Sequence, residues 1–80
     1  MNITHEITKK ADLIKLAKHS SIEIEFSDGA AQPINHSTRQ GLLDMINRPQ
    51  ATRPAFYATD MPSTYVMQEI NGEQSILRLL

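Results

Sequence analysis

Histidine and serine are the residues that could act as base and nucleophile in a catalytic site. The 80-residue chain contains no cysteine, so a thiol nucleophile is excluded. His19 and His36 are each followed directly by hydroxyl side chains. A histidine that removes the proton of a nearby hydroxyl group can activate it as a nucleophile. Adjacent residues seldom reach that geometry, and the sequence has no nucleophile-elbow motif. We therefore expect no catalytic residue and predict that the protein is not an enzyme.

Metal and cofactor sites are not predicted either. Metal binding needs several ligands that converge on one point, and the three histidines, His5, His19 and His36, lie on three different predicted elements. No Gly-rich loop precedes a predicted helix, so the phosphate-binding loops of nucleotide sites have no counterpart here. The sequence predicts no metal site and no cofactor.

Two carboxylates lie two residues apart in a predicted strand, at Glu23 and Glu25. Residues at this spacing share one face of a strand. Paired carboxylates can serve in acid–base chemistry or bind a cation. The favoured interpretation is that they solvate the exposed face of a strand whose other face is buried.

Three arginines make the middle of the chain locally basic, at Arg39, Arg48 and Arg53, and the aromatic residues Phe56 and Tyr57 follow them. Arginines near aromatic rings can contact phosphates and stack on bases. The alternative is that these arginines are scattered over the surface. A small nucleic-acid-binding domain that uses Arg39, Arg48 and Arg53 on phosphates is therefore the second functional hypothesis.

The last seventeen residues predict a C-terminal β-hairpin. Two runs rich in strand-forming residues flank Asn71-Gly72, a pair that suits the type I′ turn because both central residues need positive φ. A two-residue turn at this pair would place Val66 opposite Leu77. The side chains expected to face the core in that register are Val66, Ile70, Leu77 and Leu79.

The other side of this predicted hairpin is unusually apolar for a surface that faces solvent. It would carry Tyr65, Met67, Ile76 and Arg78. Tyr, Met and Arg are enriched in the cores of protein interfaces. We predict a protein-binding surface at these four residues, although a helix on each face of the sheet, or a different register of the hairpin, would also explain the pattern.

Two helices are expected, at residues 9–19 and 38–47. Apolar residues recur at helical spacing in both segments. Thr8 is the candidate N-cap of the first helix, and Ser37 with Gln40 matches the capping-box spacing for the second. Pro49 ends the second helix, because a proline disfavours helical geometry in the residue before it.

The strand signals complete an α+β fold: two amphipathic helices packed on a small, mainly antiparallel sheet that ends in the C-terminal hairpin. Period-two alternation marks residues 22–26, while residues 2–7, 30–34 and 55–58 are shorter candidates. We expect three to five strands. The predicted core is Leu13, Ile14, Ala17, Ile22, Ile24, Phe26, Leu42, Leu43, Ile46, Phe56, Val66, Ile70, Leu77 and Leu79.

Composition bounds the remaining possibilities. A chain of 80 residues with 40% hydrophobic and 21% charged residues is expected to form one small globular domain over residues 1–80. The formal net charge of −1 lacks the basic excess typical of duplex-DNA binders. No apolar run approaches the 18 or more residues of a membrane span. With no cysteine and no recognisable signal peptide, the cytoplasm is the expected location.

The first functional hypothesis is therefore a non-catalytic protein-binding domain. Its size and composition are like those of small inhibitors or modulators that phages and mobile elements carry as accessory proteins. The expected partner is another protein, with no membrane contact, and nucleic acid is the second choice. A homodimer formed through an open strand edge is also compatible with the sequence.

Overall fold

The computed structural model of residues 1–80 contains six strands and two helices. In chain order they are β1 (Ile3–Ile7), α1 (Lys10–Ala17), β2 (Ile22–Glu25), β3 (Ala31–Pro33), α2 (His36–Ile46), β4 (Ala55–Thr59), β5 (Thr64–Gln68) and β6 (Gln74–Leu79). All strand pairs are antiparallel, in the order β1-β4-β5-β6-β2-β3. The predicted α+β class is confirmed. The expected number of strands, three to five, was too low, because the short candidates at residues 2–7 and 30–34 both form edge strands, β1 and β3.

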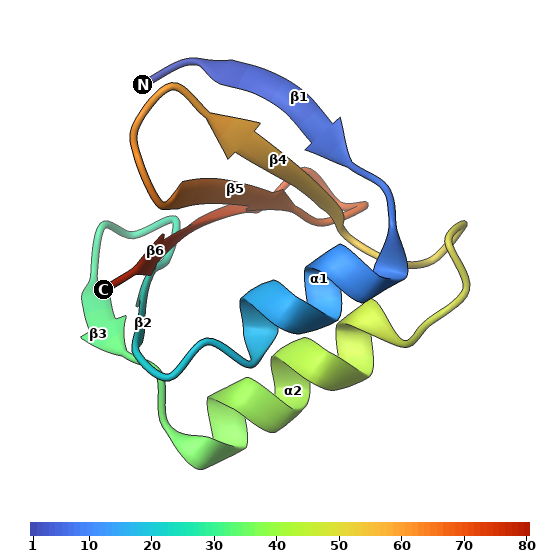
Figure 1. The fold of residues 1–80 in the computed structure, drawn as a ribbon, viewed down its shortest axis with the longest axis horizontal. Helices are drawn as coiled ribbons and strands as arrows, with labels where there is room; N and C mark the ends of the chain where they lie inside the picture. The colour runs from blue at the N-terminus through green and yellow to red at the C-terminus, as the bar shows by residue number, and fades with distance from the viewer.

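Both helices lie side by side on the same face of the curved sheet (Figure 1). Their buried side chains meet those of the four central strands in one core of Leu13, Leu16, Ala17, Ile22, Ile24, Leu42, Ile46, Phe56, Met67 and Leu77. The opposite face of the sheet, called the outer face below, has no helix over it. Neither helix is long and apolar enough to cross a membrane.

The helix ends differ in detail from the predictions. Lys9, rather than Thr8, is the N-cap of α1, and its side chain makes no capping bond. The N-cap of α2 is Asn35, whose Oδ1 accepts a hydrogen bond of 2.8 Å from the backbone N–H of Thr38. Asn is as good a cap as Ser, so α2 begins two residues earlier than the predicted capping box and Ser37 lies inside it.

The register between β5 and β6 corrects the predicted turn. The Glu69 N–H donates to the Glu73 carbonyl (2.8 Å), and the Gly72 N–H donates to the Glu69 carbonyl (2.9 Å). Gly72 has a φ of +89°, whereas Asn71 has no positive φ. Three residues, 70–72, therefore connect the strands, where a type I turn followed by a left-handed glycine is a common arrangement. The predicted two-residue type I′ turn is wrong.

This one-residue difference reverses the two faces of β5. Val66 pairs with Ile76 instead of Leu77, and Tyr65 pairs with Leu77. Because side chains alternate along a strand, a shift of one residue moves each of them to the other face. Tyr65 and Met67 consequently face the helices, together with Leu77 and Leu79.

Three predicted core residues lie outside the core. Ile70 is 72% exposed in the connection between β5 and β6, and Phe26 is 38% exposed where the chain turns at residues 26–30. Val66 is only 5% exposed but lies on the outer face, between its strand partners Tyr57 and Ile76. Leu16 and Met67 are core residues that the sequence pattern did not identify.

Candidate functional site

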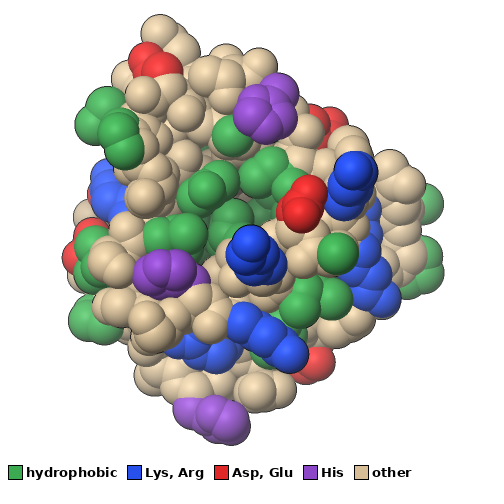
Figure 2. All heavy atoms as spheres, in the orientation of Figure 1, with side chains coloured by type: hydrophobic (Ala, Val, Ile, Leu, Met, Phe, Trp, Pro, Cys, Tyr) green, Lys and Arg blue, Asp and Glu red, His purple; other side chains and the backbone are tan.

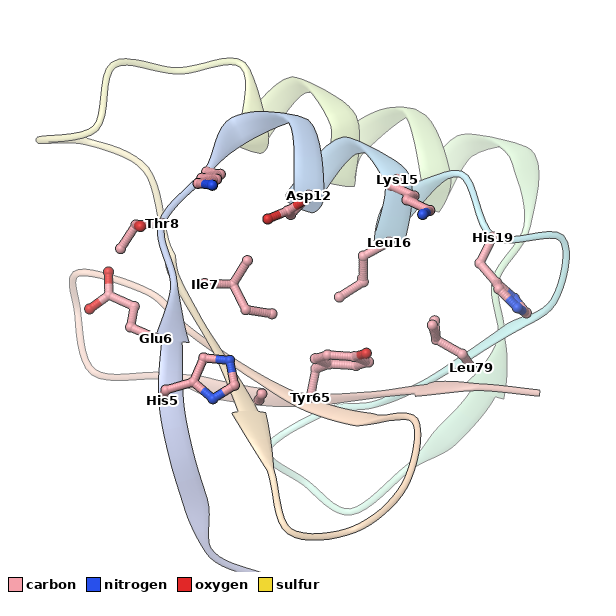
Figure 3. Close-up of a pocket in the computed structure, with 12 residues that line it drawn as sticks. His5, Glu6, Ile7, Thr8, Asp12, Lys15, Leu16, His19, Tyr65 and Leu79 are labelled. Carbon is pink, nitrogen blue, oxygen red and sulfur yellow. The ribbon is translucent and has the colours of Figure 1, made fainter.

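The largest concavity of the molecule lies on the helix side of the sheet, between β1 and α1, and has a volume of about 580 Å³. Figure 3 shows Tyr65 in its middle, with Ile7 and Leu16 above the ring and Leu79 beside it. In the space-filling view, apolar side chains are sunk in this region with charged and histidine side chains around them (Figure 2). We call this concavity the Tyr65 hollow.

Strand pairing explains why space is left beside the Tyr65 ring at the bottom of the hollow. His5 pairs with Ala58, Ala58 with Tyr65, and Tyr65 with Leu77, so these side chains form a row across four strands. Ala58 contributes only a methyl group beside the large Tyr65 ring. α1 has eight residues and is therefore roughly 12 Å long. It leaves the side chains of Tyr65 and Leu79 only partly buried.

Polar groups surround the apolar floor. Asp12 and Lys15 project from α1, while His5 and His19 lie at opposite ends of the hollow (Figure 3). Each imidazole is held locally through its Nδ1, which lies 3.1 Å from Thr4 Oγ1 in His5 and 3.0 Å from the Ser21 carbonyl oxygen in His19. A preformed apolar concavity with a few polar groups at its rim is the usual form of a binding site.

The structure separates the four residues that were predicted to share a protein-binding face. Tyr65 is in the hollow, whereas Met67 is only 6% exposed and belongs to the core. Ile76 and Arg78 lie on the outer face, because they pair with Val66 and Thr64. Of the four, Tyr65 alone lies in the hollow and is open to a partner there.

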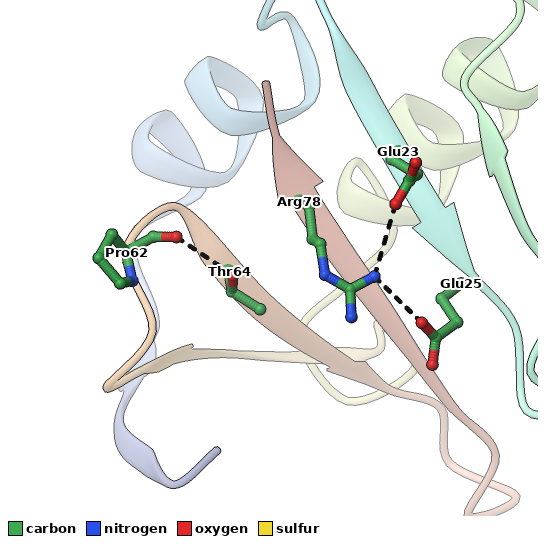
Figure 4. Close-up of polar contacts among 5 residues, drawn as sticks. All are labelled: Glu23, Glu25, Pro62, Thr64 and Arg78. Atoms are coloured by element: carbon green, nitrogen blue, oxygen red, sulfur yellow. Dashed lines mark hydrogen bonds and ion pairs between the residues drawn. The ribbon is translucent and has the colours of Figure 1, made fainter.

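On the outer face, Arg78 joins the two glutamates of β2. Its Nη1 donates to Glu25 Oε1 (3.1 Å) and lies 3.6 Å from Glu23 Oε1 (Figure 4). Glu23 and Glu25 share a face, as predicted. They contact the guanidinium of the neighbouring strand β6.

The three arginines of the nucleic-acid hypothesis do not form a cluster. Arg39 Nη1 donates to the carbonyls of Ala17 (2.7 Å) and His19 (2.6 Å) at the C-terminal end of α1. Arg53 Nη2 donates to the Thr8 carbonyl (3.4 Å), just before the other end of that helix. Arg48 lies beyond the end of α2, on a separate shallow pocket.

Sequence reasoning identified Tyr65 but missed the rest of the hollow. The pairing of β1 with β4 brings His5 next to Ala58, which is 53 positions later in the chain, and no local pattern reveals a pairing at that separation. A small residue, Ala58, opposite the large Tyr65 indicates an open space in the sheet surface, but this pair can be recognised only once the order of the strands is known. No protein-family model, curated protein or solved structure matches this chain.

Proposed function

We propose that this protein is a non-catalytic protein-binding domain and that a partner protein inserts apolar side chains into the Tyr65 hollow. The observation that carries the proposal is the partly buried Tyr65 ring in an apolar concavity that α1 covers only in part. Tyrosine rings in such pockets often dominate binding energies, because they supply a large contact area and a hydroxyl group.

The edge strand β1 supports the same proposal. It forms one wall of the hollow, and four of its five residues are exposed. Its outer backbone groups can accept an added strand, while the adjacent hollow takes one side chain of that strand. The C-terminal strand β6 offers no such edge, because it lies between β5 and β2. Pairing of β1 with a second copy remains a prediction that light scattering of the purified protein would test.

Within this proposal, the protein is an inhibitor or modulator of its partner, of the accessory type carried by phages and mobile elements, and acts in the cytoplasm. The absence of cysteine fits the cytoplasm, where disulfides are rare, and the likeness to accessory proteins is one of composition and length. The nucleic-acid alternative rests on the sequence alone, and Arg39 is already bonded within the fold. Binding of oligonucleotides that weakens as salt increases would support that alternative.

The test of the proposed function is affinity capture from the cells that express the chain, with two variants that alter the hollow. Tyr65→Ser removes the ring, and Ala58→Leu fills the space beside it. We expect a partner that binds the wild-type protein and is lost with both variants.

Ile70→Ser is the matched control, because Ile70 is a 72% exposed apolar residue in the connection between β5 and β6 and does not line the hollow. The partner should still bind this variant. Circular dichroism establishes that all three variants are folded. If every captured protein is retained by Tyr65→Ser and Ala58→Leu, the hollow is not the binding site and the proposal is wrong.

A further inference from the structure

We propose a second docking surface on the outer face of the sheet, which binds a basic segment of a partner protein. The segment has an apolar centre and Lys or Arg side chains at both ends. This surface lies on the other face of the sheet from the Tyr65 ring, and it shares with the hollow only Glu6 of the edge strand β1.

The first argument is a row of side chains that crosses the outer face. Glu6 pairs with Tyr57, Tyr57 with Val66, Val66 with Ile76, and Ile76 with Glu25. Three apolar side chains therefore lie side by side, with one carboxylate at each end; Tyr57 and Ile76 are partly exposed, whereas Val66 between them is only 5% exposed. Adjacent strands are about 4.8 Å apart, so the two carboxylates are separated by roughly 19 Å along the sheet.

The second argument is the distribution of charge, which the formal net charge of −1 conceals. The helices and their flanking loops, residues 8–20 and 36–54, contain seven Lys and Arg against two Asp, a formal charge of +5. The sheet and its other loops contain seven Asp and Glu against one arginine, Arg78, a formal charge of −6. The sheet side therefore attracts a basic partner and repels an acidic one.

The third argument concerns Arg78, which is the only cation on the sheet side. It neutralises part of the charge of Glu23 and Glu25, at 3.6 Å and 3.1 Å. A basic partner must compete with this guanidinium for the same carboxylates. Removing Arg78 should therefore strengthen binding, whereas a role of Arg78 as a contact residue requires the opposite.

A designed peptide provides the probe. An extended segment covers roughly 19 Å with about six residues, and a helix does so with about thirteen. We would use a helical peptide with Leu and Phe in the centre and Lys at both ends, and a twin with Glu in place of each Lys. Binding is followed through the backbone amide signals of the ¹⁵N-labelled protein in NMR titrations.

The expected result is that the Lys peptide shifts the amide signals of Tyr57, Val66 and Ile76, while the Glu twin does not bind. Glu6→Gln and Glu25→Gln should each weaken binding about two- to fivefold, as expected for one exposed ion pair. Arg78→Gln should strengthen binding by a similar factor. Asp44→Asn is the matched control, since it removes the same charge from the helical side, and it should change the affinity little.

Four outcomes would overturn the inference. They are failure of the Lys peptide to bind, equally strong binding of the Glu twin, weakening by Asp44→Asn as large as that by Glu6→Gln, and shifted signals around Tyr65 instead of the outer face. A fifth is self-association of the unliganded protein, seen by light scattering and abolished by Glu25→Gln, because the basic helical side of a second copy would then be the natural occupant of the outer face. None of these results affects the capture test of the Tyr65 hollow.

Discussion

At the scale of single residues, Arg39 shows how a side chain suggested for ligand binding is used within the fold. The carbonyl groups at the end of a helix have no partner inside that helix. Arg39 reaches from α2 to the end of α1 and donates to the Ala17 and His19 carbonyls, with Nη2 3.4 Å from the Ser20 carbonyl. Its positive charge also interacts favourably with the negative, C-terminal end of the helix dipole.

We therefore expect Arg39→Ala to lower the free energy of unfolding by about 1.5–3 kcal/mol, the usual range for hydrogen bonds to a charged group. Arg39→Lys should recover only part of the loss, because an ammonium group cannot reproduce the planar fork of the guanidinium. Urea unfolding measures both values. Arg48→Ala, at an exposed arginine, is the control and should stay within about 0.5 kcal/mol of the wild type. Equal effects of the two alanine variants would contradict the capping role.

At the scale of elements, the connection between β5 and β6 decides which side chains reach the Tyr65 hollow. Gly72 adopts a φ of +89°, so the three-residue connection requires a left-handed residue at that position. Gly41, in contrast, lies inside α2, and a methyl group added there would meet no atom within 4 Å.

The same substitution should consequently have opposite effects at the two glycines. Gly72→Ala should destabilise the protein by about 1–2 kcal/mol, the cost of left-handed geometry for a residue with a Cβ. Gly41→Ala should stabilise it by about 0.5–1 kcal/mol, because alanine has the higher helix propensity. Thermal unfolding followed by circular dichroism gives both changes. Stabilisation by Gly72→Ala would show that the turn differs from the one described.

Local patterns were sufficient to predict the elements but not their arrangement. The alternation of Ile22 and Ile24 with Glu23 and Glu25 identifies β2 and both of its faces, because burial on one side imposes that pattern. The register of β5 and β6 depends on one glycine torsion angle, which Asn71-Gly72 does not determine. Both residues suit more than one turn type.

The candidate site was predictable only in part, for a related reason. The residue type of Tyr65 predicted a binding role, but its apolar surroundings come from strands distant in the sequence. Arg78 was expected to share a face with Tyr65, and the one-residue change in register places it on the other side of the sheet. Strand order and register are properties of the whole chain, which single-sequence patterns describe poorly.

At the scale of the whole molecule, the separation of charge between the helical side and the sheet side is the most prominent electrostatic property. The molecule measures 29 × 27 × 23 Å. At about 10 mM ionic strength the Debye length is about 30 Å, so each charged side still attracts an oppositely charged surface that approaches it closely.

We expect the protein to be retained on both cation- and anion-exchange resins at this low ionic strength, despite a net charge of −1. Each resin should bind the side of opposite charge. Elution should occur near 0.15 M salt, where the Debye length falls to about 8 Å. A double variant, Lys10→Gln with Lys18→Gln, should lose retention on the cation exchanger and keep it on the anion exchanger. Retention on one resin only would mean that the two sides are not separated enough to act independently.

The central place of β6 has a consequence for how quickly the protein folds. β6 joins the β1-β4-β5 part of the sheet to the β2-β3 part, and its pairing of Leu79 with Ile22 closes a loop that includes most of the chain. Contacts between residues so far apart in sequence slow the crossing of the folding barrier. Stopped-flow refolding should accordingly take milliseconds to seconds, and substitutions in residues 74–79 should reduce the refolding rate more than substitutions in β3.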